Sequence, residues 1–214
     1  MTSQAIPRRS PLILGGLWIS VLIAVGVVLR RLYAFANPNP AGPPQLVRLD
    51  RAFDGHRALT VAHILPALAF VLLAPLVLLR KDAAWMKPIL LAIGTVVGVT
   101  AYAMSSFAVG GHVEQAAVLL FNSLFLYWLW RAYLEGGRTE GEAARRSWIR
   151  SVAVLLGIAT TRPVMGVFFA TSRLTGLEPE QFFGPAFWIG FSVNTLAVEW
   201  WLRRQPRNTS ARKD

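Results

Sequence analysis

The chain contains no cysteine, only three histidines, and half as many acidic residues (11) as lysines and arginines (22). The lack of cysteine excludes disulfides, thiolate catalysis, cysteine-bound iron–sulfur clusters and cysteine-based zinc sites. The sequence also lacks metalloprotease, P-loop, serine-hydrolase and dinucleotide-binding motifs, and it has no long polar segment to form a soluble catalytic domain. These absences favour a non-enzymatic protein and predict no metal site.

Charge of either sign is scarce. Charged residues make up 15% of the chain and hydrophobic residues 54%, whereas soluble domains carry about 25% charged residues. A bilayer span takes about 20 apolar residues, and a hydrocarbon environment favours helices because they satisfy their own backbone. The sequence therefore predicts an all-α bundle of six transmembrane helices, at residues 11–29, 58–79, 88–109, 113–134, 148–170 and 185–202.

The positive charges are distributed unequally between the two ends of these helices. If the N-terminus is cytoplasmic, the cytoplasmic segments carry 15 of the 22 lysines and arginines and the outer segments carry six. This bias predicts a bacterial inner-membrane protein with both termini in the cytoplasm. The net charge of +11 then reflects topology and contacts with anionic lipids rather than nucleic acid. Arg30 and Arg31, on the outer side, are expected to extend to the membrane surface.

Four segments follow from this pattern. Residues 1–36 hold a basic segment and the first helix, and residues 37–57 form a Pro-rich outer loop with a short amphipathic stretch. Residues 58–204 form a five-helix domain, and residues 205–214 form a basic tail. A signal peptide cleaved near Ala36 is the alternative for the first helix. The long apolar run and the Arg30-Arg31 pair favour an uncleaved helix.

The segment LYWLWRAYLEGGRTEGEAARRSWIRSVAVLLGIATTRP, residues 126–163, resembles a bacterial membrane family known as domain of unknown function 2306. FWIGFSVNTLAVEWWLRR, residues 187–204, is similar to the same family's last helix, and His63 stands where the family has a histidine. The resemblance covers about residues 58–204. It implies a fold and a membrane location but no reaction. The family's His-Arg pairs have no histidine here, near Trp85 and Ala144.

Arg162 interrupts the fifth apolar run near the middle of the membrane. A charge at that depth costs about 3 kcal/mol on insertion scales. Its planar guanidinium suits an anionic headgroup or a small anion. Alternatively, Arg162 is a structural arginine satisfied by helix carbonyls, Asn122, Asn194 or Glu114. The sequence leaves both interpretations open.

Several polar residues accompany Arg162 in the outer half of the predicted bundle. Counting 1.5 Å per helical residue predicts a polar pocket open to the outer face and lined by His63, Tyr102, His112 and Arg162. Asn122 and Asn194 are candidate ligand contacts or interhelical hydrogen-bonding groups near the midplane. Glu199 and Arg203 stand four residues apart, which predicts a structural ion pair.

Three functions compete. The first is a non-enzymatic membrane protein that holds a lipid or small anion at Arg162. The second is a transporter of small molecules or protons, which the lack of a visible inverted repeat weakens. The third is a haem or quinone redox protein, with His63 and His112 as haem ligands. The Gly94-x-x-x-Gly98 spacing predicts close packing of two helices, either within the chain or in a homodimer.

Overall fold

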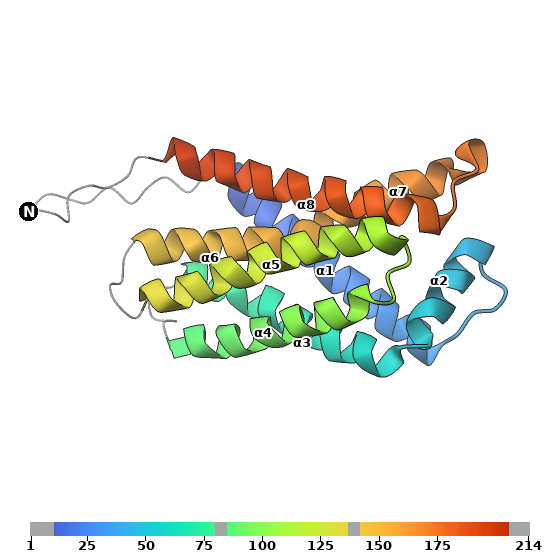
Figure 1. Ribbon diagram of the computed structural model, residues 1–214, viewed down its shortest axis with the longest axis horizontal. Helices are drawn as coiled ribbons and strands as arrows, with labels where there is room; N and C mark the ends of the chain where they lie inside the picture. The colour runs from blue at the N-terminus through green and yellow to red at the C-terminus, as the bar shows by residue number, and fades with distance from the viewer. Residues whose placement is uncertain (1–10, 80–84, 137–141, 206–214) are drawn as a thin grey trace, which may run out of the picture.

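The computed structural model describes residues 11–79, 85–136 and 142–205 (Figure 1). Every element in these ranges is a helix, which confirms the predicted all-α class. The helices are α1 (Pro11–Ala36), α2 (Pro44–Asp54), α3 (Arg57–Leu79), α4 (Lys87–Ser105), α5 (Gly111–Gly136), α6 (Glu142–Leu155), α7 (Gly157–Thr175) and α8 (Pro179–Arg204).

Five helical segments are long and apolar enough to cross a membrane: Leu14–Ala36, Arg57–Val77, Lys87–Ser105, Gly111–Gly136 and Glu142–Thr175. They coincide with the first five predicted spans, and the fifth combines α6 and α7. The sixth predicted span lies in α8, which is as long as α1 but is not among the five segments found in the described ranges. Polar residues such as Asn194 and Glu199 lower its mean hydropathy.

The fifth span is interrupted, although the sequence predicted one continuous helix. α6 ends at Leu155 and α7 begins at Gly157. The Ala159 amide donates to the carbonyl of Leu156, three residues earlier, at 2.9 Å. Two sequence features accompany this break. Gly157 permits close contact with α8, and Pro163 has no amide hydrogen to donate to the carbonyl four residues earlier. α6 and α7 nevertheless form one apolar segment of 34 residues, Glu142–Thr175.

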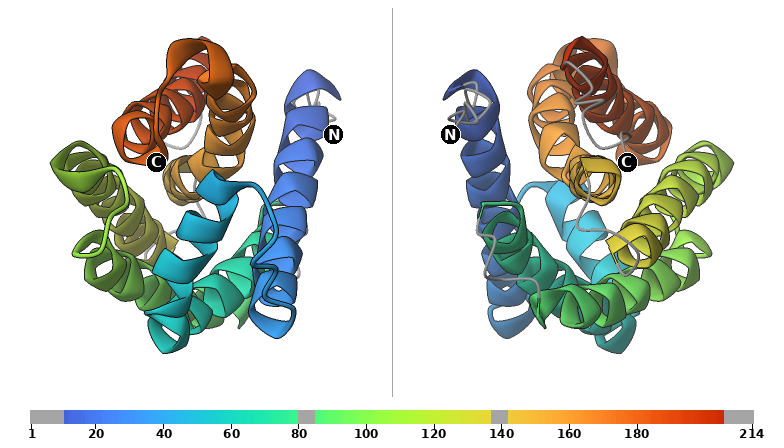
Figure 2. Two further views of the ribbon diagram at one scale, coloured as in Figure 1. Left: turned by 90° about the vertical axis from the view of Figure 1, so that its right-hand side faces the viewer. Right: turned by 90° about the vertical axis from the view of Figure 1, so that its left-hand side faces the viewer.

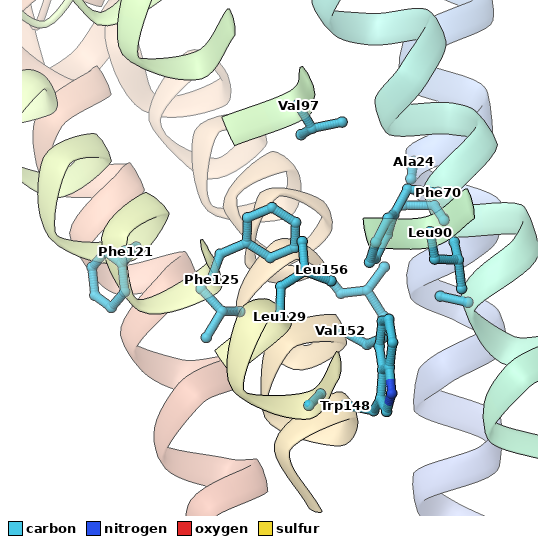
Figure 3. Packing of buried hydrophobic residues seen from close by; sticks show 14 of the residues in the cluster. Ala24, Phe70, Leu90, Val97, Phe121, Phe125, Leu129, Trp148, Val152 and Leu156 are labelled. Carbon is cyan, nitrogen blue, oxygen red and sulfur yellow. The ribbon is translucent and has the colours of Figure 1, made fainter. Parts of the chain in front are cut away.

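The helices surround α6 and leave α2 at one end of the bundle (Figure 2). α5 packs along α6 and α4, α7 packs along α8, and α1 contacts α3 and α7. Large side chains from α3, α4, α5 and α6 form the main core, in which the Phe70 and Phe125 rings meet edge to face at 5.5 Å (Figure 3). Leu90 and Leu129 in this core are fully buried.

Gly94 and Gly98 pack within the chain. Both are buried, and an added β-carbon would meet Leu129 at Gly94 or Leu126 at Gly98, in each case at 2.5 Å. The close helix contact predicted from their spacing is therefore the α4–α5 contact. The homodimer through Gly94 and Gly98 stays a prediction, and within the chain α5 packs against both glycines.

Gly190 of α8 packs against Thr161 of α7, and its replacement tests this packing. A β-carbon on Gly190 would overlap the Thr161 backbone, whereas one on Gly16 would meet nothing within 4 Å. We expect Gly190→Ala to lower the free energy of unfolding by about 1–3 kcal/mol. Gly16→Ala should leave it unchanged or raise it by up to about 1 kcal/mol. Thermal denaturation followed by size exclusion in detergent measures both, and equal midpoints for the two variants would contradict the α7–α8 contact.

Candidate ligand-binding site

A cavity of about 600 Å³ lies inside the bundle, and side chains from all eight helices line it. Its wall is mostly apolar. The charged side chains that reach it are Arg30 and Arg31 of α1, Glu114 of α5 and Arg162 of α7. We refer to Arg30, Arg31 and Arg162 as the arginine cluster. The uncharged polar side chains of the wall are His56, Thr60, His63, Ser105 and Asn122.

Arg162 has almost no partner among the described residues. One terminal nitrogen lies 3.8 Å from the Met165 sulfur, a weak acceptor, and Nε is buried without a hydrogen bond. In the described ranges no carboxylate lies within 4.0 Å of the guanidinium. Glu114 faces the same cavity and attracts Arg162 from a longer distance, while its carboxylate accepts from the Gly110 amide at 2.7 Å.

Neither asparagine satisfies Arg162, so that part of the structural interpretation is wrong. The Asn122 amide donates to the Gly98 carbonyl at 2.9 Å and joins α5 to α4. Asn194 accepts from the Thr160 hydroxyl at 2.8 Å and donates to the Ala153 carbonyl at 3.3 Å, away from the cavity. Both side chains serve as interhelical hydrogen-bonding groups, and only Asn122 also borders the cavity.

Arg31 is a site residue that the sequence interpretation missed. Instead of extending outward, both Arg30 and Arg31 bind Asp50 of α2, at 2.8 and 2.6 Å. The Arg31 guanidinium also stacks 4.0 Å from the centre of the Phe53 ring, and the residue is only 8% exposed. A carboxylate on a neighbouring helix provides a charge-assisted hydrogen bond, which explains why Arg31 turns inward.

α2 lies at one end of the bundle (Figure 2), and its residues Leu46, Leu49, Ala52 and Phe53 line the cavity. Its apolar face buries Leu49 against Met165, Phe182 and Phe183. Its polar face forms an ion pair from Arg48 to Glu178, in the turn between α7 and α8. The predicted amphipathic stretch is therefore a helix that docks on α1, α7 and α8.

Two of the four residues predicted to line the pocket do line the cavity. His63 and Arg162 line the cavity, and a His63 ring nitrogen lies 3.0 Å from the Thr100 hydroxyl. Tyr102 instead contacts the Ser123 hydroxyl at 2.7 Å, and His112 is exposed beside Gln115. These two side chains leave their helices in directions that do not reach the cavity.

The histidines do not fit a haem with two axial imidazoles, which must oppose one another. His63 faces the cavity and His112 faces outward. His56 borders the cavity too, but it stacks on Phe107 with ring centres 3.7 Å apart and lies seven residues before His63, next to the same helix. Side chains on one face of one helix point the same way rather than at each other.

The predicted ion pair between Glu199 and Arg203 is confirmed, at 3.2 Å. Glu199 also accepts two hydrogen bonds from Arg150 of α6, at 2.8 and 3.3 Å. Arg150 in turn lies over the Trp128 ring, 4.7 Å from its centre. These contacts join α5, α6 and α8 at the end of the bundle opposite α2, and none of their residues reaches the cavity.

Searches against protein-family models, curated protein sequences and solved structures found no match to this chain. The family resemblance noted in the sequence therefore stays a prediction. The geometry of the site itself indicates recognition of an anion. The site joins Arg162, which has no carboxylate partner in the described part of the chain, with a second arginine held by Asp50 and a largely apolar wall.

Asp50 is the residue to change in order to test how α2 is held. Asp50→Asn leaves the buried Arg31 without a carboxylate, which we expect to lower the free energy of unfolding by about 2–4 kcal/mol. The control is Asp54→Asn, because Asp54 pairs with Arg57 at 3.5 Å on an exposed surface, where ion pairs contribute only about 0–1 kcal/mol. Thermal unfolding of both variants measures the two losses of stability. Equal losses would show that the Asp50 pairs do not hold α2.

Proposed function

We propose that this chain is a six-span protein of the bacterial inner membrane, with both termini in the cytoplasm. We further propose that it is non-enzymatic and binds a lipid headgroup or small anion at Arg162. The observation that carries this proposal is the buried guanidinium of Arg162, which has no ion-pair partner among the described residues and lines a cavity within apolar helices.

The six-span count rests on α8. This helix runs beside α5 and α7 along the bundle (Figure 1) and packs against α5, α6 and α7. A helix of 26 residues is about 39 Å long, more than the roughly 30 Å hydrocarbon core. If α5 and the α6–α7 segment cross the bilayer, α8 crosses with them. Its polar groups are largely used inside the protein, as Asn194 and Glu199 show.

An anionic ligand would provide the negative charge that the described residues do not place against Arg162. Charged groups in a membrane interior pair with one another or with a ligand, and they mark binding sites and pathways. Arg30 and Arg31 share Asp50, and Glu114 is engaged by the Gly110 amide. Arg162 lines the cavity, where a carboxylate or phosphate can accept hydrogen bonds from its guanidinium.

Arg162→Leu tests the proposal directly. We expect the variant to fold, because the arginine makes no strong bond within the described chain, and to lose an anionic lipid or other anion that co-purifies with the wild type. Native mass spectrometry of the detergent-solubilised protein measures the bound mass. Arg173→Leu is the matched control, because Arg173 is an exposed arginine on the same helix. Loss of folded protein with Arg162→Leu but not with Arg173→Leu would instead make Arg162 a structural residue.

Transport is a second candidate, and the break at Leu156 favours it. Residues on both sides of the break, Leu155 and Ile158, line the cavity, and interrupted helices beside a central cavity are common in transporters. A transporter would expose its cavity to each side of the membrane in turn, whereas a binding protein would expose it to one side.

Single cysteines distinguish the two candidates, because the chain has none of its own. A membrane-impermeant maleimide should label Leu174→Cys from outside and Ser210→Cys from the cytoplasm if the six-span topology holds. Asn122→Cys, which borders the cavity, should react from one side only for a binding protein and from both sides for a transporter. Asn194→Cys, away from the cavity, is the control for non-specific access. Labelling of Leu174→Cys and Ser210→Cys from the same side would contradict the topology.

A further inference from the structure

We propose, building on the anion site at Arg162, that the cavity binds a single-chain amphiphile with one negative charge. A long-chain carboxylate is the simplest such molecule. Its head would lie between Arg31 and Arg162, and its chain would follow the apolar wall of the cavity.

The charges around the cavity point to a monoanion. The arginine cluster contributes three positive charges, whereas Asp50 and Glu114 contribute two negative ones. One positive charge is left over from these arginines and carboxylates. Because Arg30 is about half exposed, the buried charge that lacks compensation is that of Arg162, which no carboxylate contacts in the described ranges, and such a charge is strongly disfavoured. A single carboxylate balances the site, whereas a dianionic phosphate would leave an excess negative charge.

The positions of Arg31 and Arg162 indicate where the charged head of the ligand would bind. Arg31 and Arg162 line the same cavity, and their positive charges repel one another. The Asp50 carboxylate reduces that repulsion at Arg31, through a contact of 2.6 Å, but not at Arg162. An anion between the two guanidinium groups would convert their repulsion into two attractions.

The wall beyond the arginines suits a hydrocarbon chain. Ala67 and Val71 follow His63 along α3, one and two helical turns later, in the direction away from α2. Both line the cavity. They face apolar side chains of α4, α5 and α6, namely Val97, Phe125, Val154 and Leu155. A small hydrophilic anion would leave this surface in contact with water, which is unfavourable in proportion to the apolar area.

The volume of the cavity suits a ligand with one chain. A methylene group takes about as much room as a liquid water molecule, ~30 Å³. A cavity of about 600 Å³ therefore holds on the order of 20 carbons. A two-chain phospholipid has more than 30 chain carbons, ~900 Å³ or more by the same measure, which is larger than this volume. The cavity thus favours a single chain of about 16 carbons with its head.

The experiment measures binding of radiolabelled hexadecanoate to the full chain in nanodiscs of zwitterionic phosphatidylcholine, as the excess over protein-free nanodiscs. We expect saturation at one molecule per chain. Unlabelled hexadecanol, with the same chain but no charge, should compete at least tenfold less well than unlabelled hexadecanoate. Acetate, with the same head but no chain, should compete at least a hundredfold less well.

Two variants separate the head from the chain. Arg162→Gln should weaken hexadecanoate binding at least tenfold, whereas the control Arg173→Gln should leave it unchanged. Ala67→Phe fills part of the apolar wall; it should weaken hexadecanoate binding at least tenfold and leave octanoate binding within twofold. If Arg162→Gln does not fold, the competition series and Ala67→Phe decide the question.

The outcomes distinguish this inference from the proposal on which it rests. Equal competition by hexadecanol and hexadecanoate, or an unaltered affinity in Ala67→Phe, would overturn the single-chain carboxylate. If inorganic phosphate or phosphatidylglycerol binds in an Arg162-dependent manner and hexadecanoate does not, the inference fails and the anion site stands. If no tested anion depends on Arg162, both fail.

Discussion

The burial of the Arg162 charge is the constraint on which the rest of this structure depends. Without compensation, a guanidinium inside an apolar bundle costs several kcal/mol. The residues that the structure describes do not offset that cost with a directly bound carboxylate or with Asn122 or Asn194. It surrounds the group with a cavity and places Glu114 within electrostatic range. A protein built only for stability would be served better by an apolar side chain at this position, so the arrangement favours a ligand.

The fold keeps this cavity in place through contacts at both ends of the bundle. At one end, Arg30, Arg31 and Asp50 hold α2 against α1, and Leu49 buries the apolar face of α2 against α7 and α8. At the other end, Arg150 and Glu199 join α6 to α8. Between these ends, the break at Leu156 separates α6, which lies in the core, from α7, which carries Arg162. The site is thus assembled from segments that lie far apart in the sequence.

The sequence predicted the helices well because hydrophobic length is a local property. It identified the five apolar spans and the Glu199–Arg203 pair, which is also local. It placed His63 and Arg162 in one pocket but added Tyr102 and His112 wrongly. Depth along a helix follows from the rise per residue, whereas the direction of a side chain depends on the tilt and rotation of its helix. The Arg31–Asp50 pair was missed for a related reason, since a Pro-rich loop of unknown path separates the two residues.

A crystal structure of the protein, extracted from its membrane with native lipid and without added anions, tests the central claim most directly. We predict density in the cavity against the Arg162 guanidinium, continuing along the wall formed by Ala67 and Val71. A structure in which Arg162 forms a direct ion pair with Glu114, and in which side chains close the cavity around it, would contradict the account. Arg162 would then be a structural residue that the chain satisfies by itself.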